Sequence, residues 1–504
     1  MYRRPSPGQL SFENFYLPFG GKLSGENRWV KLSQLIAWEE LEAQYAGQFS
    51  SQMGAPAKPF RMALGALIIK ERLGISDEET VEQIRENPYL QYFIGCSEYS
   101  DQASFDSSMM VHFRKRLSLE MVGQINERIV MKSMRSNQAT NATEDESQSK
   151  QDNDGDDLGD DPAAPPNQGE LILDASCAPA DIRYPTDLSL LNEAREHTET
   201  VIDILYEQLR EQNEKKPRTY RQQARREYLK VAKQRQVQSK AMRKAIRQQL
   251  GYVRRNLAHI DALVAAGASL STLSRSLYRK LLVVSEVFRQ QQTMYQQRQH
   301  RIDHRIVSLS QPHVRPIVRG KARTPVEFGA KISLSCVDGI VFLDHLSWDN
   351  FNESGDLPQQ IEQFKQRFGH YPAAVVADQI YRTRANRQYC QQRGIRLSGK
   401  PLGRPVVAEQ SAVRQQAQAD ARIRNQIEGK FGQGKRRFTL ARVMAKLAST
   451  AETTIAITCL VMNLERLLQA LLFVLFPLLF SLCQFPMKGR HRQSSQESRV
   501  WKPA

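Results

Sequence analysis

The sequence predicts an α/β domain that is interrupted by a long basic helical insertion and preceded by an all-α N-terminal domain. Apolar residues recur at helical spacing over residues 1–134. Short buried-strand runs alternate with helical patterns after residue 170. A block rich in Arg, Lys and Gln, residues 191–320, separates the first strand run from the later ones. At 504 residues the chain is long enough for several domains with their own cores.

The charge and the cysteines restrict the class of protein. A formal net charge of +17 favours a polyanionic partner, nucleic acid before an acidic membrane surface. The six cysteines include no CxxC pair, which argues against a zinc site and a disulfide framework and fits a reducing cytoplasm. The first twenty residues lack an apolar core of the secretory type, so we expect no signal peptide.

Residues 1–134 are expected to form a helical DNA-binding domain. Gly74 is a predicted helix stop, and Ser76, followed by three acidic residues, a predicted helix start. A second amphipathic helix in "SFDSSMMVHFRKRLS" ends in the basic residues 114–116. Helix, short turn and basic helix suit a helix-turn-helix variant, although a plain helical bundle has the same pattern.

Residues 135–169 are expected to be an acidic disordered linker. Between residues 141 and 170 there are ten Asp or Glu and one Lys, with almost no apolar side chains, so this segment cannot bury enough surface to fold. A mimic of DNA that shields basic surface is the alternative.

The helical insertion, residues 191–320, accounts for essentially the whole net positive charge of the chain. Residues 205–320 contain 25 Lys or Arg and 7 Asp or Glu, a surplus as large as the net charge of the chain. A solvated helical arm is one interpretation. Because the charge is so one-sided, we favour contact with DNA.

The interrupted α/β domain comprises residues 170–190 and 321–465. A buried run, Leu171 to Leu173, ends at Asp174, and "AAVVADQIY" contains a similar run that ends at Asp378. Between them, "VEFGAKISLSCVDGIVFLDHLSW" reads as two strands joined by a hairpin turn at Asp338-Gly339. A long helix predicted over residues 408–436 carries Glu428.

Asp174, Asp378 and Glu428 are the candidate catalytic residues. If the two aspartate-bearing strands are neighbours in one sheet, their carboxylates emerge close together, and the long helix can bring Glu428 to them. Three carboxylates can bind two Mg²⁺ ions for phosphodiester displacement, since hard cations choose oxygen ligands. The basic residues around Glu428 in "RIRNQIEGKFGQGKRRF" would then hold the DNA backbone.

Each acid also has a structural interpretation. A strand-terminal Asp is often a cap, and Glu428 stands four residues after Arg424, the spacing of a helical ion pair. Three nearby acids compete for the role of ligand: Asp344, Asp349 and Glu353.

The spacing around Glu428 resembles that of a known family. Arg424, Glu428 and Lys435 reproduce the R-(3)-E-(6)-K part of the Y-(2)-R-(3)-E-(6)-K signature of bacterial insertion-sequence transposases of the DDE class. The segment "ADQIYRTRANRQYCQQRGIRLSGKPLGRP", with Tyr381 and Asn386, looks like their second-Asp region.

Two further segments extend the resemblance over most of the chain. "ILDAS" looks like the first-Asp strand of these transposases, and residues 44–134 are similar to the helical domain that they commonly carry. The sequence departs from the signature at its tyrosine position, which is occupied by Ala421. In the family that tyrosine contacts DNA at the transposon end, and the departure does not touch the metal ligands.

The resemblance implies an RNase H-like catalytic domain that cleaves inverted-repeat ends and joins the freed 3′-hydroxyl to target DNA. It implies two Mg²⁺ ions, with Mn²⁺ as a substitute, held by Asp174, Asp378 and Glu428. It also implies a homodimer on double-stranded DNA in the cytoplasm, associated with the nucleoid. The DNA contacts that we expect are Arg424, Lys435, Arg436, Arg437 and Tyr381.

Residues 466–504 are expected to form an apolar C-terminal helix and a basic tail. The apolar stretch 467–485 approaches the length of a bilayer span, but Gln469 and Pro477 interrupt it. We favour a helix packed on the core and expect no stable membrane association.

Two other classes of function stay open. The same fold would serve a metal-dependent nuclease without strand transfer, or an inactive relative that only binds DNA. A non-enzymatic basic coiled-coil protein would explain the insertion, but it leaves the strand-borne aspartates and the Arg/Glu/Lys spacing unexplained.

Overall fold

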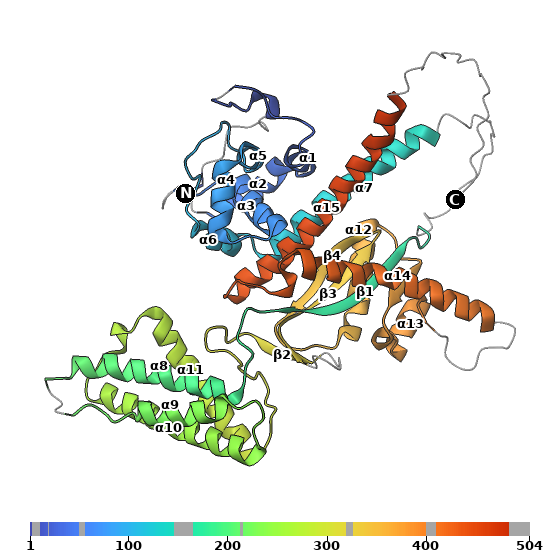
Figure 1. Ribbon diagram of the computed structural model, residues 1–504. Coiled ribbons are helices and arrows are strands. Elements are labelled where there is room, and N and C mark those ends of the chain that lie inside the picture. The colour runs from blue at the N-terminus through green and yellow to red at the C-terminus, as the bar shows by residue number, and fades with distance from the viewer. Residues whose placement is uncertain are drawn as a thin grey trace, which may run out of the picture.

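A computed structural model shows three parts: an N-terminal helical module, a mixed sheet with covering helices, and a helical insertion that extends away from the sheet (Figure 1). The structure describes residues 1–2, 11–18, 20–49, 56–145, 165–211, 215–318, 326–399 and 410–482. The acidic run at 146–164 and the basic tail after residue 482 lie outside the described residues.

The N-terminal module is all helical, as predicted. Gly74 ends one helix in the left-handed conformation with φ +68°, and the Ser76 side chain caps the next by accepting a hydrogen bond from the Glu79 N–H. Both predicted helix signals are therefore confirmed. The last helix continues through Asp145, past the predicted start of the linker at residue 135. The helices are α1 (Arg28–Leu35), α2 (Trp38–Ala46), α3 (Phe60–Leu73), α4 (Asp77–Glu86), α5 (Pro88–Phe93), α6 (Met109–Arg116) and α7 (Leu119–Asp145).

The described residues form one mixed sheet of six strands, with the path β2-β3-β1-β5-β6 and with β4 paired to β3. Strand β3 pairs in antiparallel fashion with β1, β2 and β4. Strand β5 pairs in parallel with β1 on one side and with β6 on the other. The strands are β1 (Glu170–Pro179), β2 (Arg315–Val318), β3 (Val326–Val337), β4 (Ile340–Ser347), β5 (Ala374–Ala377) and β6 (Arg396–Leu397). Strand β2 lies inside the range predicted for the insertion, so the sheet resumes earlier than expected.

A tight turn and a close backbone approach, both at glycines, determine how the antiparallel strands pair. Asp338 and Gly339 both adopt positive φ, 51° and 78°, and make the two-residue turn between β3 and β4, which confirms the predicted hairpin. Gly329 lies where β3 pairs with both β1 and β2, and a Cβ there would stand 2.1 Å from the Ala178 carbonyl oxygen. Only glycine allows this close approach.

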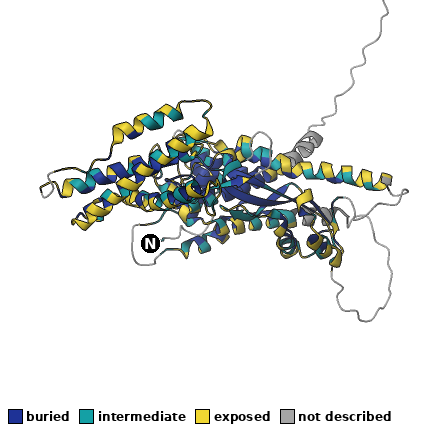
Figure 2. Ribbon diagram, turned by 90° about the horizontal axis from the view of Figure 1, so that it is seen from below, coloured by how far each residue is buried: buried dark blue, intermediate teal, exposed yellow. Residues whose placement is uncertain are grey.

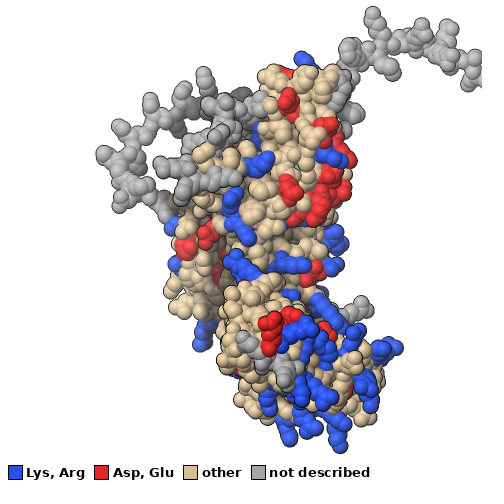
Figure 3. All heavy atoms as spheres, turned by 90° about the vertical axis from the view of Figure 1, so that its left-hand side faces the viewer, with Lys and Arg blue, Asp and Glu red and all other residues tan. Residues whose placement is uncertain are grey.

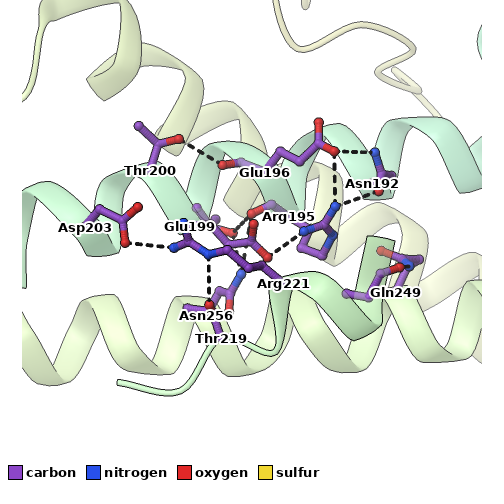
Figure 4. Close-up of polar contacts among 12 residues, drawn as sticks. Asn192, Arg195, Glu196, Glu199, Thr200, Asp203, Thr219, Arg221, Gln249 and Asn256 are labelled. Atoms are coloured by element: carbon purple, nitrogen blue, oxygen red, sulfur yellow. Dashed lines mark hydrogen bonds and ion pairs between the residues drawn. The ribbon is translucent and has the colours of Figure 1, made fainter. Parts of the chain in front are cut away.

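The insertion follows β1 and is a compact bundle of four helices with apolar clusters of its own. A buried polar network also joins its helices (Figure 4). Arg195 of the first helix pairs with Glu199 at 2.5 Å, and the Asn256 amide donates to the Thr198 hydroxyl at 3.0 Å. In chain order these helices lie between β1 and β2 of the sheet. The helices of the insertion are α8 (Asp187–Gln208), α9 (Arg221–Ala232), α10 (Ser239–Ala265) and α11 (Arg275–Gln297).

Four further helices cover the sheet, whose strands are largely buried (Figure 2). Gly369 ends the first of them with φ +82°, and the third matches the long helix expected over residues 408–436. The last begins well before the predicted boundary at residue 466. These helices are α12 (Leu357–Phe368), α13 (Arg384–Gln392), α14 (Gln410–Arg437) and α15 (Ala448–Leu482).

Helix α15 joins the N-terminal module to the sheet and runs beside α7 (Figure 1). The buried Asn463 side chain accepts a hydrogen bond from the Val341 N–H at 2.9 Å and donates to the Val341 carbonyl at 2.7 Å. It also donates to the side-chain amide oxygen Oδ1 of Asn126 on α7 at 2.8 Å. The Asn463 amide therefore pairs with backbone groups of β4 that the β3–β4 ladder leaves free.

Among the described residues, one segment, Ala448–Leu471 of α15, is long and apolar enough to cross a membrane by length and composition. In the apolar window of this segment, 78% is buried inside the protein. A core helix of this kind passes the same test, and the contacts of Asn463 are those of a core helix. Most of the apolar stretch 467–485 has side chains outside the described residues.

Candidate active site

The two predicted aspartates lie on neighbouring parallel strands. Strands β1 and β5 pair in parallel up to Leu173 opposite Ala377. Asp174 is the next residue of β1, and Asp378 directly follows the end of β5. The expectation that these strands are neighbours is confirmed. The expectation that the first strand ends at Asp174 is wrong, because β1 continues to Pro179 along β3. The antiparallel partner holds β1 extended beyond the point where β5 stops.

Glu428 reaches the same place from α14. Ile427 and Phe431 bury their side chains in the core and fix the helix against the sheet. A cavity of about 930 Å³ is lined by all three predicted carboxylates, Asp174, Asp378 and Glu428. The structure thus brings together three residues that are far apart in the sequence.

Arg424 links two of these carboxylates. Its guanidinium donates to Asp378 at 2.8 Å and pairs with Glu428, one turn away, at 3.0 Å. The helical ion-pair interpretation of Glu428 is therefore confirmed as a contact, and the same side chain also lines the cavity. Glu428 can therefore be both a partner in a helical ion pair and a candidate metal ligand.

The neighbouring charges and the burial of the site affect the pKa of Asp174. Burial raises the pKa of Asp174 to about 6, against the lowering effect of the Ala175 N–H, which donates to its carboxylate at 2.8 Å. The negative charges of Asp378 and Glu428 raise this pKa as well, while the Arg424 guanidinium lowers it. Such like-charge crowding is common where carboxylates share a cation.

The donor set suits a hard cation by its chemistry, since every predicted ligand is a carboxylate oxygen. The described residues contain no group of three or more His, Cys, Asp or Glu side chains already arranged to hold a metal ion. At this site Arg424 supplies the positive charge that neutralises Asp378 and Glu428. A cation between the carboxylates would have to replace that guanidinium.

The three acids that compete for the role of metal ligand lie in different surroundings. Asp344 is buried against Arg367, with the atoms of the ion pair 3.0 Å apart, and burial raises its pKa. Asp349 is exposed and pairs with Arg315 at 3.4 Å. Glu353 does line the cavity, where it forms an ion pair with Lys331.

Lys331 is the residue of this wall that the sequence reasoning missed. It is 9% exposed, and its ammonium group donates to the Phe351 carbonyl at 2.6 Å besides pairing with Glu353. A lysine inside the otherwise apolar and small-residue run "GAKISLS" was the available signal, because a buried strand rarely carries a cation without a partner.

The residues of α14 that are predicted to contact DNA differ in how much of their charge is used inside the protein. Lys435 lines the cavity, and Arg436 is exposed on the same helix. Arg437 is half exposed and pairs with Glu465 of α15 at 2.9 Å, so part of its charge is used inside the protein.

The prediction that Tyr381 contacts DNA is corrected by the structure. Its side chain has no exposed surface and belongs to the main hydrophobic core, so in this structure it cannot contact DNA. A similar finding applies to the basic end of α6, where Arg114 is buried and donates to Asp77 at 2.9 Å. Both side chains are buried by packing against other parts of the chain, and the local sequence does not show this.

The geometry defines a class of protein: an α/β protein in which carboxylates from two neighbouring parallel strands and a helix line one cavity. Comparison with known proteins agrees with this class. Residues 375–465, which include Asp378, Glu428 and the Arg424 and Lys435 positions, match the family described as "Transposase DDE domain". Residues 18–116 match "Transposase domain (DUF772)". Both matches are to domains of transposases, and each covers about a fifth of the chain.

One relative has a description that names no role. The chain is 36% identical over 88 residues to a protein described as "Uncharacterized protein ORF8 in nfe locus" from Rhizobium meliloti. This similarity covers 18% of the chain and 42% of that protein, so the chain spans less than half of the relative's length. No solved structure matches the chain.

Proposed function

We propose that the protein cleaves the ends of an insertion sequence and joins them to target DNA, with Asp174, Asp378 and Glu428 as metal ligands in an RNase H-like catalytic domain. The observation that carries this proposal is the convergence of the three carboxylates on one cavity from two parallel strands and a facing helix. The mixed sheet, with its parallel strands at the site, supports the proposed fold.

The three carboxylates would hold two Mg²⁺ ions, or Mn²⁺ in their place, which when bound supply Lewis-acid activation of the attacking and leaving oxygens. Asp174 is the carboxylate of the three whose pKa burial raises, so a bound cation would stabilise its charged form. Lys435 would hold the DNA phosphate backbone at the rim of the cavity. Arg424, once released from the carboxylates, has a guanidinium suited to a phosphate by its planar pair of donors.

The experiment that tests this function uses a labelled DNA fragment that carries the native flanks of the gene. With Mg²⁺ we expect discrete cuts at both flanks and joined products when target DNA is added; with EDTA we expect neither, because the carboxylates alone supply no Lewis acid. Cuts without joined products would favour the nuclease, and tight binding without cuts the inactive relative. Cuts that persist in EDTA would contradict the metal-carboxylate proposal.

The insertion is proposed to hold DNA alongside the catalytic domain. Lys and Arg side chains gather on the part of the surface that it forms in Figure 3. On α10 the exposed cations Lys240, Lys244 and Arg247 follow one another at helical spacing. Such a row suits the regularly spaced charges of a phosphate backbone, while the apolar clusters of the bundle keep the row rigid.

A triple variant, Lys240→Gln, Lys244→Gln and Arg247→Gln, tests the role of this row. We expect weaker DNA binding and a slope of log affinity against log salt that falls by about 0.9 for each phosphate that the variant no longer neutralises. Fluorescence anisotropy over a salt series measures both quantities, and an unchanged melting temperature shows that the bundle stays folded. An unchanged slope would mean that DNA does not lie on this face.

Two ends must be cut and joined together, so we propose that the protein acts as a homodimer on double-stranded DNA, in the cytoplasm and associated with the nucleoid. Its positive net charge supports association with DNA. Sedimentation with and without the flank DNA would measure the stoichiometry.

A further inference from the structure

Among the described residues, four carboxylates line the cavity of the proposed active site, one more than the three predicted ligands. The fourth belongs to Glu353. Lys331 of β3 forms an ion pair with Glu353, whereas Arg424 of α14 pairs with Asp378 and Glu428. The two cations differ in burial and in their other contacts, and this difference bears on which carboxylates a divalent cation can reach.

The Lys331–Glu353 pair is more buried than the pairs of Arg424. Its side chains are 11% and 18% exposed, while those of Asp378 and Glu428 are 55% and 50% exposed. An exposed ion pair stabilises little, because water solvates both charges once they separate. Separation of a buried pair leaves an uncompensated charge in a poorly solvated place, which costs far more. A cation that enters the cavity can therefore displace Arg424 more easily than Lys331.

Lys331 also has contacts that hold it in place apart from the ion pair. Its ammonium group donates to the Phe351 carbonyl at 2.6 Å and lies 4.8 Å from the centre of the Phe351 ring. That ring stacks on His345, with the ring centres 4.0 Å apart. The backbone of Lys331 is fixed by the pairing of β3 with β1, opposite Cys177. The ammonium group cannot leave Glu353 without losing its contacts to Phe351.

The backbone at Glu353 is fixed as well. Glu353 begins the 3₁₀ turn η3 (Glu353–Gly355), which Asn352 caps by accepting a hydrogen bond from the Ser354 N–H at 3.2 Å. The buried Asn386 amide donates to the Ser354 carbonyl at 2.7 Å. The turn therefore keeps Glu353 beside Lys331.

We propose that Lys331 selects the metal ligands: it neutralises Glu353 and so leaves Asp174, Asp378 and Glu428 to bind the cations. Without Lys331, Glu353 would be a fourth carboxylate donor in the same cavity, and hard cations bind carboxylate oxygens. An ion drawn toward Glu353 would leave its reactive position, and a misplacement of about 1 Å can slow a reaction about a hundredfold. Lys331 is then a positioning residue that acts through Glu353. The inference rests on the proposed function, which supplies the metal ions.

Mn²⁺ binding to the full chain without DNA tests the selection, with the EPR signal of free Mn²⁺ as the measure of affinity. Glu353→Gln, Asp378→Asn and Glu428→Gln each remove one negative charge from the same cavity, so the three variants are matched in charge. We expect Asp378→Asn and Glu428→Gln to weaken Mn²⁺ binding at least about tenfold, since even a group that only supports a ligand contributes that much. Glu353→Gln should weaken it by no more than about threefold, because Lys331 already neutralises Glu353.

Lys331→Met is the converse variant, since it removes the cation, keeps the length of the side chain and releases Glu353. We expect Mn²⁺ to bind about tenfold more tightly and the flank DNA to be cut at least about tenfold more slowly. The double variant of Lys331→Met with Glu353→Gln, whose net charge equals that of wild type, should move both values back toward wild type. The matched control is Lys365→Met, at an exposed lysine of α12 outside the cavity lining, which should change neither value.

Two results would overturn the selection. One is that Glu353→Gln weakens Mn²⁺ binding as much as Asp378→Asn, a comparison that does not depend on the folding of Lys331→Met. The other is wild-type Mn²⁺ affinity in Lys331→Met when its melting temperature shows a folded protein. Cleavage of the flank DNA by wild type reports the proposed function separately. If wild type cuts nothing while the Mn²⁺ affinities follow the expected order, the function fails and the selection of ligands stands.

Discussion

Asp378→Asn is expected to abolish DNA cleavage while DNA binding is retained. The change keeps the size of the side chain and removes one of the charges that would hold the metal ions. The carboxylate side chain is 55% exposed and its main contact is the Arg424 ion pair, so the fold should lose little stability. Losing a metal ligand removes several kcal/mol of transition-state stabilisation, and we expect a rate at least about a thousandfold lower.

The assay compares initial cleavage rates of the flank DNA in Mg²⁺, and anisotropy in EDTA measures binding. Glu428→Gln should behave in the same way, since it removes a carboxylate from the same cavity. Asp349→Asn is the matched control, because Asp349 is an exposed aspartate with an ion pair of its own outside the cavity lining. Full cleavage activity of Asp378→Asn, or an equal loss of activity in Asp349→Asn, would contradict the assignment of Asp378 as a metal ligand.

Asn463→Leu is expected to cause the largest loss of stability of the changes considered. The substitution leaves the Val341 N–H without its 2.9 Å acceptor and Asn126 without its donor, both inside the core. Each buried polar group left unpaired costs about 1–3 kcal/mol, so the free energy of unfolding should fall by about 3 kcal/mol. Melting temperature measures the total, and hydrogen exchange of the β4 peptide measures the local effect.

Asn126→Leu serves as the comparison, because Asn463 then keeps both of its hydrogen bonds to Val341. We expect a smaller loss and slow exchange at Val341 for this variant. The double variant should cost less than the sum, as is usual for residues in one network. Equal melting temperatures for Asn463→Leu and wild type would show that the amide does not stabilise the edge of the sheet.

Local signals in the sequence were enough to predict many of the elements. Gly74 and Gly369 end helices because glycine reaches the left-handed region without strain, and Asp338-Gly339 makes the tight hairpin for the same reason. The break after the first strand was visible as a change from apolar to basic composition. The bounds of β1 and α7 were missed, because a neighbouring strand or helix extends an element beyond its local pattern.

The sequence by itself determined the candidate acids, Asp174, Asp378 and Glu428, and the one-sided charge of the insertion, since both depend on residue type and spacing. The tertiary structure decided which acids meet: β1 and β5 pair in parallel, and α14 lies across them. It also decided that Tyr381 belongs to the core and that Arg424 pairs with both Asp378 and Glu428. Burial and contacts between distant residues come from packing of the whole chain, and no local pattern carries that information.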